Sequence, residues 1–257
     1  MESEYNWDII RAWVNGKLGM QFDQWNTPAG EYSLIWHLSD ELEDYYGVYV
    51  WRMLEHTCIS VPRNLWKETG AAIDRQLAAG RPVSALTEAE FWRAALGERA
   101  QRIIGPAYQG FLDEYHFRPA NSQGARKLNL DDADDEAALR AFLAACPPDD
   151  WEASAILFKH QSVMGLERNG ALVAVASAPA RRYHAAEIYS VGVVTLPAAR
   201  GTGAGLAVVS ALTERIITSY PSMLLHYQTL RANLPSVAIA QRLGFEELAT
   251  SLAVRLR

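Results

Sequence analysis

The chain of 257 residues contains only two cysteines, Cys58 and Cys146, which lie far apart in the sequence. Two isolated cysteines do not make a disulfide framework, so we expect both to be packing residues of a cytoplasmic protein. The first residues are acidic and polar, and they lack the basic start and apolar run of a signal peptide. No apolar stretch approaches the roughly 20 residues that cross a bilayer as a helix, so no membrane contact is expected.

An excess of positive charge is also missing, since the formal net charge is −6. A mildly acidic chain has no general attraction for phosphate backbones, so nucleic acid is not expected as a partner. The six histidines include no His-x-x-x-His pair, and no metal site is expected.

Tryptophan is spread unevenly, because seven of the eight precede residue 93. The polar segment 118–129 contains Pro and Gly and lacks apolar periodicity, which is typical of a linker. A chain of this length also suits two units. We therefore predict a mainly helical N-terminal domain over residues 1–120, with an open role, and a second domain over residues 127–257.

In the N-terminal part, apolar residues recur near helical spacing. Thr87 and Glu90 form a Thr-x-x-Glu capping box, which predicts the start of one helix. Residues 58–61 favour a lone strand, and Gly105-Pro106 is expected to break the helix in which it lies. The other predicted helices cover residues 8–14, 38–55, 65–79 and 98–115.

The C-terminal part alternates helices and strands. Residues 131–146 predict an amphipathic helix, and two strands flank Asn169-Gly170, a dipeptide that favours a two-residue hairpin turn. The predicted elements after that hairpin are a strand over 187–195, a helix over 206–220, a strand over 223–230, a helix over 236–243 and a strand over 247–256. This order predicts an α/β fold with a mixed sheet and helices on both faces.

Three glycines, Gly201, Gly203 and Gly205, lie between a predicted strand and a predicted helix. Their bare amides at the positive end of a helix would bind phosphate or pyrophosphate, and Arg200 adds a formal charge. An ordinary glycine-rich turn is the alternative interpretation. The loop is followed by Leu206, where a P-loop requires Lys and a dinucleotide fingerprint requires Gly or Ala, so both of these loops are excluded.

The segment Arg200-Gly-Thr-Gly-Ala-Gly205 resembles the acyl-CoA loop of the GNAT superfamily of N-acetyltransferases. That loop reads Arg or Gln, two residues, Gly, one residue, and Gly or Ala. A second family signature is matched by Asn233, Ser236 and Gly244-Phe245. The resemblance covers about residues 127–257. It implies a GNAT-like acyl-CoA N-acyltransferase domain with acetyl-CoA as cosubstrate.

The resemblance also implies a reaction and a set of binding residues. An acetyl or other acyl group would pass to a primary amine of a small molecule or protein, by direct attack in a ternary complex. A backbone N–H near Val193 or Val194 would stabilise the oxyanion. The implied cofactor-binding residues are Val193, Val194, Thr195, Arg200, Gly201, Thr202, Gly203, Ala204, Gly205, Asn233 and Ser236.

The attacking ammonium must first lose a proton, so a base is required. Glu187 is the candidate, on the same strand face as Tyr189, the position on which a catalytic Glu falls in the histone-modifying branch of the family. The Tyr that many members use as general acid is replaced by Ala240. Tyr227, His226, Tyr189 or water could replace it.

Two functions stay open at this point. One is an active N-acyltransferase whose N-terminal unit covers one side of the acceptor cleft. The other, favoured by Ala240, is a non-catalytic acyl-CoA-binding or regulatory interaction module. The N-terminal unit could be a degenerate copy of the same fold, a lid or an element of a homodimer, and the sequence does not name the acceptor amine.

Overall fold

A computed structural model describes residues 5–20, 31–37, 42, 46–150, 162–183 and 186–257. The strands are β1 (Tyr32–Trp36), β2 (Gly47–Met53), β3 (His56–Val61), β4 (Ala100–Leu112), β5 (Ala125–Lys127), β6 (Val163–Arg168), β7 (Ala171–Ser177), β8 (Ala180–Tyr183), β9 (Ala186–Thr195), β10 (Leu224–Leu230) and β11 (Glu246–Leu256). The α-helices are α1 (Trp7–Leu18), α2 (Trp66–Ala78), α3 (Ala89–Leu96), α4 (Ala133–Ala145), α6 (Ala204–Ser219) and α7 (Leu234–Leu243).

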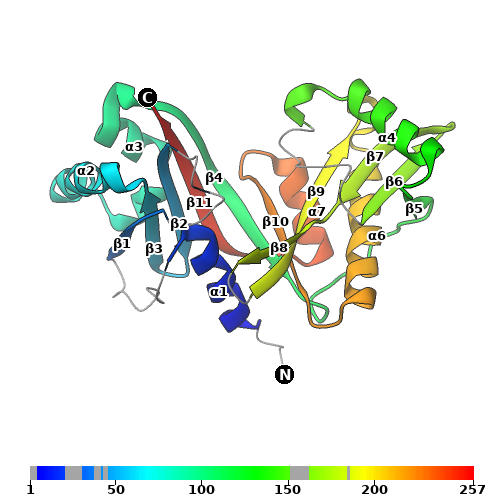
Figure 1. Ribbon diagram of the computed structural model, residues 1–257, viewed down its shortest axis with the longest axis horizontal. Coiled ribbons are helices and arrows are strands. Elements are labelled where there is room, and N and C mark those ends of the chain that lie inside the picture. Colours follow the sequence, from blue (N-terminus) through cyan, green and yellow to red (C-terminus); the bar gives the residue numbers. More distant parts are fainter. Residues whose placement is uncertain (1–4, 21–30, 38–41, 43–45, 151–161, 184–185) are drawn as a thin grey trace.

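The strands form one mixed 11-stranded sheet in the order β1-β3-β2-β11-β4-β10-β9-β7-β6-β5, with β8 paired to β9. The predicted α/β class with a mixed sheet is therefore confirmed. Figure 1 shows two lobes that diverge from a shared base, with β4 and β11 along one and β9 along the other. None of the helices in the described part of the chain has the length and apolar character needed to span a bilayer.

The N-terminal part differs from the mainly helical domain that was expected, because β1 to β4 all lie in the sheet. The described part of the predicted helix 38–55 contains β2, a run of β-branched and aromatic residues that favours a strand. Its residues are almost all buried, so the alternation that marks a half-exposed strand is absent.

The predicted helix 98–115 is the long strand β4. Pro106 therefore lies in a strand and not at a helix break. It occupies the point where the pairing of β4 with β11 shifts register, between the pairs Ile104–Ala253 and Ala107–Ser251. A proline is tolerated at such an irregularity because no ladder hydrogen bond requires its missing N–H.

The other N-terminal helices and strands that the sequence predicts are present in the structure. Helices predicted over 8–14 and 65–79 are confirmed as α1 and α2. The strand predicted over 58–61 exists as β3, but it is not a lone strand, because it pairs with both β1 and β2. Helix α3 also exists, but the capping box does not form. Glu88 is its N-cap without a side-chain bond, and the Thr87 hydroxyl donates to the Ser84 carbonyl at 3.1 Å.

The elements predicted in the C-terminal part occur in the predicted order, and their ends lie within two residues of the predicted limits, but the short strands β5 and β8 were not predicted. Asn169 and Gly170 both have positive φ angles, 53° and 78°, as the predicted hairpin turn requires. Asp132 caps α4 by accepting from the N–H groups of Asp134 and Asp135. Local signals were strong here, because each turn and helix start carries its own marker residue.

Strand β4 lies between β10 and β11 and pairs antiparallel with both. The boundary predicted between residues 120 and 127 falls in the loop after β4, yet the sheet is continuous across it. The two parts of the chain are thus joined through residues 100–112.

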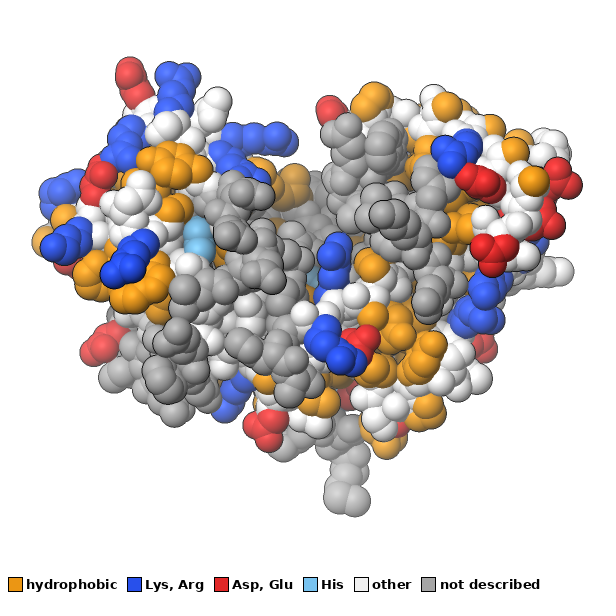
Figure 2. All heavy atoms as spheres, viewed as in Figure 1, with side chains coloured by type: hydrophobic (Ala, Val, Ile, Leu, Met, Phe, Trp, Pro, Cys, Tyr) orange, Lys and Arg blue, Asp and Glu red, His pale blue; other side chains and the backbone are white. Residues whose placement is uncertain are grey.

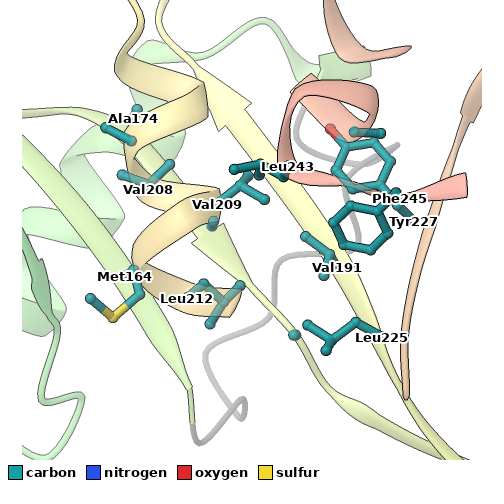
Figure 3. Close-up of a cluster of buried hydrophobic side chains, with 14 of the residues drawn as sticks. Met164, Ala174, Val191, Val208, Val209, Leu212, Leu225, Tyr227, Leu243 and Phe245 are labelled. Atoms are coloured by element: carbon teal, nitrogen blue, oxygen red, sulfur yellow. The ribbon is translucent and has the colours of Figure 1, made fainter. Parts of the chain in front are cut away.

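Helices cover both faces of the sheet. On one face, here named the α6/α7 face, Val208, Leu212 and Leu243 pack with Tyr227 of β10 in a buried apolar cluster (Figure 3). On the other, the α1 face, Trp13 packs on His226, the neighbouring residue of β10, at 4.8 Å between ring centroids. Consecutive strand residues point to opposite faces, so α1 and the pair α6/α7 lie on opposite sides.

Candidate active site

The parallel strands β9 and β10 pair over only four positions, from Ile188–Leu224 to Val191–Tyr227. Beyond Val191, β9 continues to Thr195 beside β7, whereas β10 continues beside β4. The two strands therefore diverge and leave a gap (Figure 1). Half of the backbone groups of a paired antiparallel strand point away from the partner, so those of residues 192–195 that point away from β7 face this gap. Such a gap suits an extended ligand that contains amides.

The glycine loop forms the N-terminus of α6. Gly203 is the N-cap with φ of 82°, and no side chain caps the helix. Gly201 has φ of 73°, and a Cβ atom at either glycine would meet nothing within 4 Å. The first-turn N–H groups are therefore free of side-chain acceptors at the positive end of the helix, which is an arrangement that binds anions.

Gly205 serves a different purpose, which is close packing. A Cβ atom there would lie 2.9 Å from Thr195 Oγ1 and 3.2 Å from Ile239 Cδ1. The missing side chain lets α6 approach both β9 and α7, and it places the glycine loop at the open end of the gap.

Two guanidinium groups flank the loop. Arg200 Nη2 donates to Asp150 Oδ2 at 2.6 Å, and Arg200 Nε donates to the Thr195 carbonyl at 3.3 Å. Arg168 Nη1 donates to Thr202 Oγ1 at 2.8 Å, which the sequence did not predict because Arg168 lies 34 residues earlier in a hairpin. The loop thus has one arginine held by an acid and one held by a hydroxyl.

A cavity of about 880 Å³ connects the glycine loop with the gap between β9 and β10. Among the predicted cofactor residues, only Thr202 does not line it. Those that do are Val193, Val194, Thr195, Arg200, Gly201, Gly203, Ala204, Gly205, Asn233 and Ser236. Figure 2 shows a notch between the two lobes in this region.

The second signature lies beside the gap. Asn233 is the N-cap of α7, and its Oδ1 accepts from the Ser236 N–H at 3.4 Å. The Ser236 hydroxyl lies 2.9 Å from the Tyr227 hydroxyl. Tyr227 is buried, lines the cavity and occupies the last position at which β10 pairs with β9. Burial raises the pKa of Tyr227 to about 12, so its hydroxyl keeps its proton at neutral pH.

Residues 163–254 match the family model described as FR47-like protein. This segment is an FR47-like domain, which is related to the GNAT acetyltransferases. The match begins at β6 and includes the glycine loop, the gap and the second signature, but it excludes β4. Curated protein sequences give no match to the chain.

Several solved structures are similar to the chain. A GNAT-family acetyltransferase from Colwellia psychrerythraea has 15% identity and a TM-score of 0.43, with 66% of this chain and 62% of that one covered. A GCN5-related N-acetyltransferase from Kribbella flavida has 20% identity and a TM-score of 0.46, with coverage of 63% and 62%. The aminoglycoside N-acetyltransferase AAC(6')-Iy in complex with CoA has 19% identity and a TM-score of 0.37, with coverage of 48% and 92%. The chain spans less than two thirds of the length of the first two.

Within the FR47-like domain, Glu187 and Tyr189 do not line the cavity. Glu187 lies four residues before Val191, on the order of 13 Å along the strand, and its Oε2 accepts from Arg182 Nη2 at 2.6 Å. Tyr189 stacks on Tyr220, at the end of α6 remote from the glycine loop, with 5.5 Å between ring centroids. The base role of Glu187 stays a prediction, and Tyr227 is the predicted catalytic side chain that the fold brings to the cavity.

The side of the cavity away from the glycine loop includes residues that lie mostly outside the matched segment. We name them the β4/β11 wall: Tyr49, Arg102, Ile104, Ala107, Ser251 and Ala253. No sequence motif marks this wall, because it arises only when β4 inserts beside β11. It supplies the FR47-like domain with a second surface facing the gap.

Proposed function

We propose that the protein is an N-acyltransferase that uses acetyl-CoA, or another acyl-CoA, and transfers the acyl group to a primary amine. The observation that carries this proposal is the single cavity that joins an uncapped helix N-terminus to the gap between β9 and β10. A diphosphate fits the first, and a pantetheine arm with its two amides fits the second. The FR47-like match covers both features.

The reaction follows from where charge develops. The amine lone pair attacks the thioester carbonyl carbon, a C–N bond forms, and the carbonyl oxygen becomes an oxyanion that a backbone N–H near Val193 or Val194 would stabilise. The C–S bond then breaks, the nitrogen loses one proton to water, and the thiolate takes a proton. Tyr227 holds a hydroxyl proton at the point where β9 and β10 separate, so we assign it the role of proton donor.

A non-catalytic acyl-CoA-binding module is the second candidate. Two observations favour it: Ala240 is fully buried and carries no hydroxyl, and Glu187 lies away from the cavity. Both candidates share the loop and the gap, so only turnover separates them.

The test follows free thiol release from acetyl-CoA with a panel of primary amines, together with the thermal shift that acetyl-CoA causes. Turnover with at least one amine is expected. A saturating ligand at about 100 times its Kd should stabilise the fold by roughly 2.7 kcal/mol. A thermal shift without thiol release would favour the non-catalytic module.

Gly203→Glu tests the loop itself, because it places bulk and negative charge where the diphosphate would lie. Loss of acetyl-CoA binding in calorimetry is expected. Gly80→Glu is the matched control, since Gly80 also has a positive φ, of 88°, and open space around it, but lies after α2. Equal binding of acetyl-CoA by both variants would mean that the glycine loop does not hold the diphosphate.

A further inference from the structure

The β4/β11 wall carries one charged side chain, Arg102, and no acid. Arg102 makes no side-chain hydrogen bond or ion pair within the described part of the chain. The acids that line the cavity, Asp149 and Asp150, accompany the loop residue Arg200, to which Asp150 is paired. Arg102 therefore has no acidic partner on the wall, whereas the two acids of the cavity lie on the side of the glycine loop.

A second cation lies beside the wall, on the α1 face. The Lys17 ammonium lies 6.0 Å from the ring centroid of Tyr49, a wall residue, and 5.1 Å from that of Trp13. Ring faces attract a cation without neutralising its charge. Two cationic side chains, one from β4 and one from α1, thus lie at or near the wall.

The wall also holds an oriented hydroxyl. Ser251 is buried, and its Oγ accepts from Gln109 Nε2 at 2.7 Å. Gln109 Oε1 lies 2.7 Å from His226 Nε2, and burial lowers the pKa of His226 well below 6.5, so the ring is neutral and donates through Nε2. Ser190 Oγ lies 3.4 Å from the remaining ring nitrogen. This row crosses β9, β10, β4 and β11 on the α1 face.

The direction of the row decides what Ser251 can do. Because the Gln109 amide donates to Ser251, the Ser251 hydroxyl proton is left for an acceptor in the cavity. An amide in the middle of the row is not a proton carrier, so the row fixes an orientation and does not draw protons from the substrate. Ser251 therefore acts as a fixed donor on the same wall as Arg102.

The two groups are spaced along the strands. Ser251 pairs with Ala107, and Arg102 pairs with Arg255, so they lie four residues apart along β11, on the order of 13 Å. Ile104 and Ala253 lie between them and are apolar. The wall thus offers a neutral donor, an apolar strip and a cation in sequence.

We propose that the acceptor of the acyl group is an amine that also carries a carboxylate, and that Arg102 binds this carboxylate while Ser251 donates to a polar group along the acceptor. The proposal rests on the acyltransferase function above and names its substrate class. Polyamines and basic peptides find no acid on this wall, so they are poor acceptors.

The test compares glycine, diglycine, triglycine and tetraglycine, as acceptors, with the C-terminal amide of each. The fully extended acceptors are up to about 14 Å long. Removing the carboxylate lowers the pKa of the nearby amine and makes it the better nucleophile, so a preference for the acids cannot come from intrinsic reactivity. We expect at least one acid to exceed its amide about tenfold in kcat/KM, the effect of one charge-assisted contact. Arg102→Gln should remove that preference, and Ser251→Ala should lower kcat/KM for acid and amide alike.

Arg93→Gln is the control, because Arg93 is an exposed arginine of α3 paired with Glu90. Calorimetry with tetraglycine and its amide on the CoA-loaded protein gives a readout without turnover. Equal use and equal binding of acids and amides would overturn the proposal. So would an Arg102→Gln variant that weakens CoA binding and keeps the acid preference, because Arg102 would then serve a cosubstrate phosphate. Absence of thiol release with every amine, alongside carboxylate-dependent binding, would defeat the acyltransferase function and leave the carboxylate site standing.

Discussion

Gln109 is the side chain on which the buried polar row depends. It is fully buried and bridges His226 and Ser251 at 2.7 Å each. Gln109→Met keeps the size and removes both bonds. Trp13 and Phe111 lie 4.8 and 5.0 Å from the His226 ring, so water does not replace the lost partner there, whereas Ser251 faces the cavity and can be hydrated. One orphaned buried donor and one lost hydrogen bond cost about 2–3 kcal/mol of unfolding free energy.

The measurement is urea unfolding followed by tryptophan fluorescence, for Gln109→Met, His226→Phe and the double variant. Each single variant strands a buried polar atom of the other residue, whereas the double variant removes both. The double variant should therefore lose about 1–2 kcal/mol less than the sum of the two single changes. Additive losses, or a Gln109→Met variant within about 0.5 kcal/mol of the parent, would refute the row as described.

Three further outcomes are expected. Asp150→Asn releases Arg200 from an exposed ion pair, so acetyl-CoA should bind about two- to fivefold more tightly in calorimetry; weaker binding would mean that Asp150 orients Arg200 for the ligand. Tyr227→Phe should lower kcat about 100-fold while the Kd of acetyl-CoA changes little, and an unchanged kcat would assign the proton to water. The pKa of His226 is lower in the folded protein than in the unfolded chain, so the unfolded chain binds a proton first as the pH falls. The free energy of unfolding should therefore decrease below about pH 6.5, by up to about 1.4 kcal/mol per pH unit. His226→Phe should flatten this slope, and an unaltered slope would assign the titration to another group.

The sequence predicted the cofactor side of the cavity because its signals are local. Bare glycines before a helix, a hairpin dipeptide and capping residues each act over a few positions, and most of the implied binding residues line one cavity. Strand β2 was not predicted because almost all of its residues are buried, which removes the alternation of apolar and polar residues. Strand β4 was not predicted because Pro106 was interpreted as a break in a helix.

The opposite wall was not predictable in the same way. Arg102 and Ser251 face one cavity only because β4 and β11 pair over a sequence separation of about 140 residues, and no pattern near either residue signals this. Arg168 reaches the glycine loop through a hairpin for the same reason. Counting along a strand placed Glu187 on a plausible face but did not show how far it lies from the point where β9 and β10 separate.

The position of β4 has a practical consequence for truncation. A fragment limited to residues 163–254 would keep β10 and β11 but lose the strand that fills the space between them. Two long edges would then be open to other chains, and such a fragment is expected to aggregate. During synthesis, residues 100–112 leave the ribosome long before either neighbour, so β4 pairs only after β10 and the eleven residues of β11 have been made. A fragment designed to fold alone should therefore include residues 100–112.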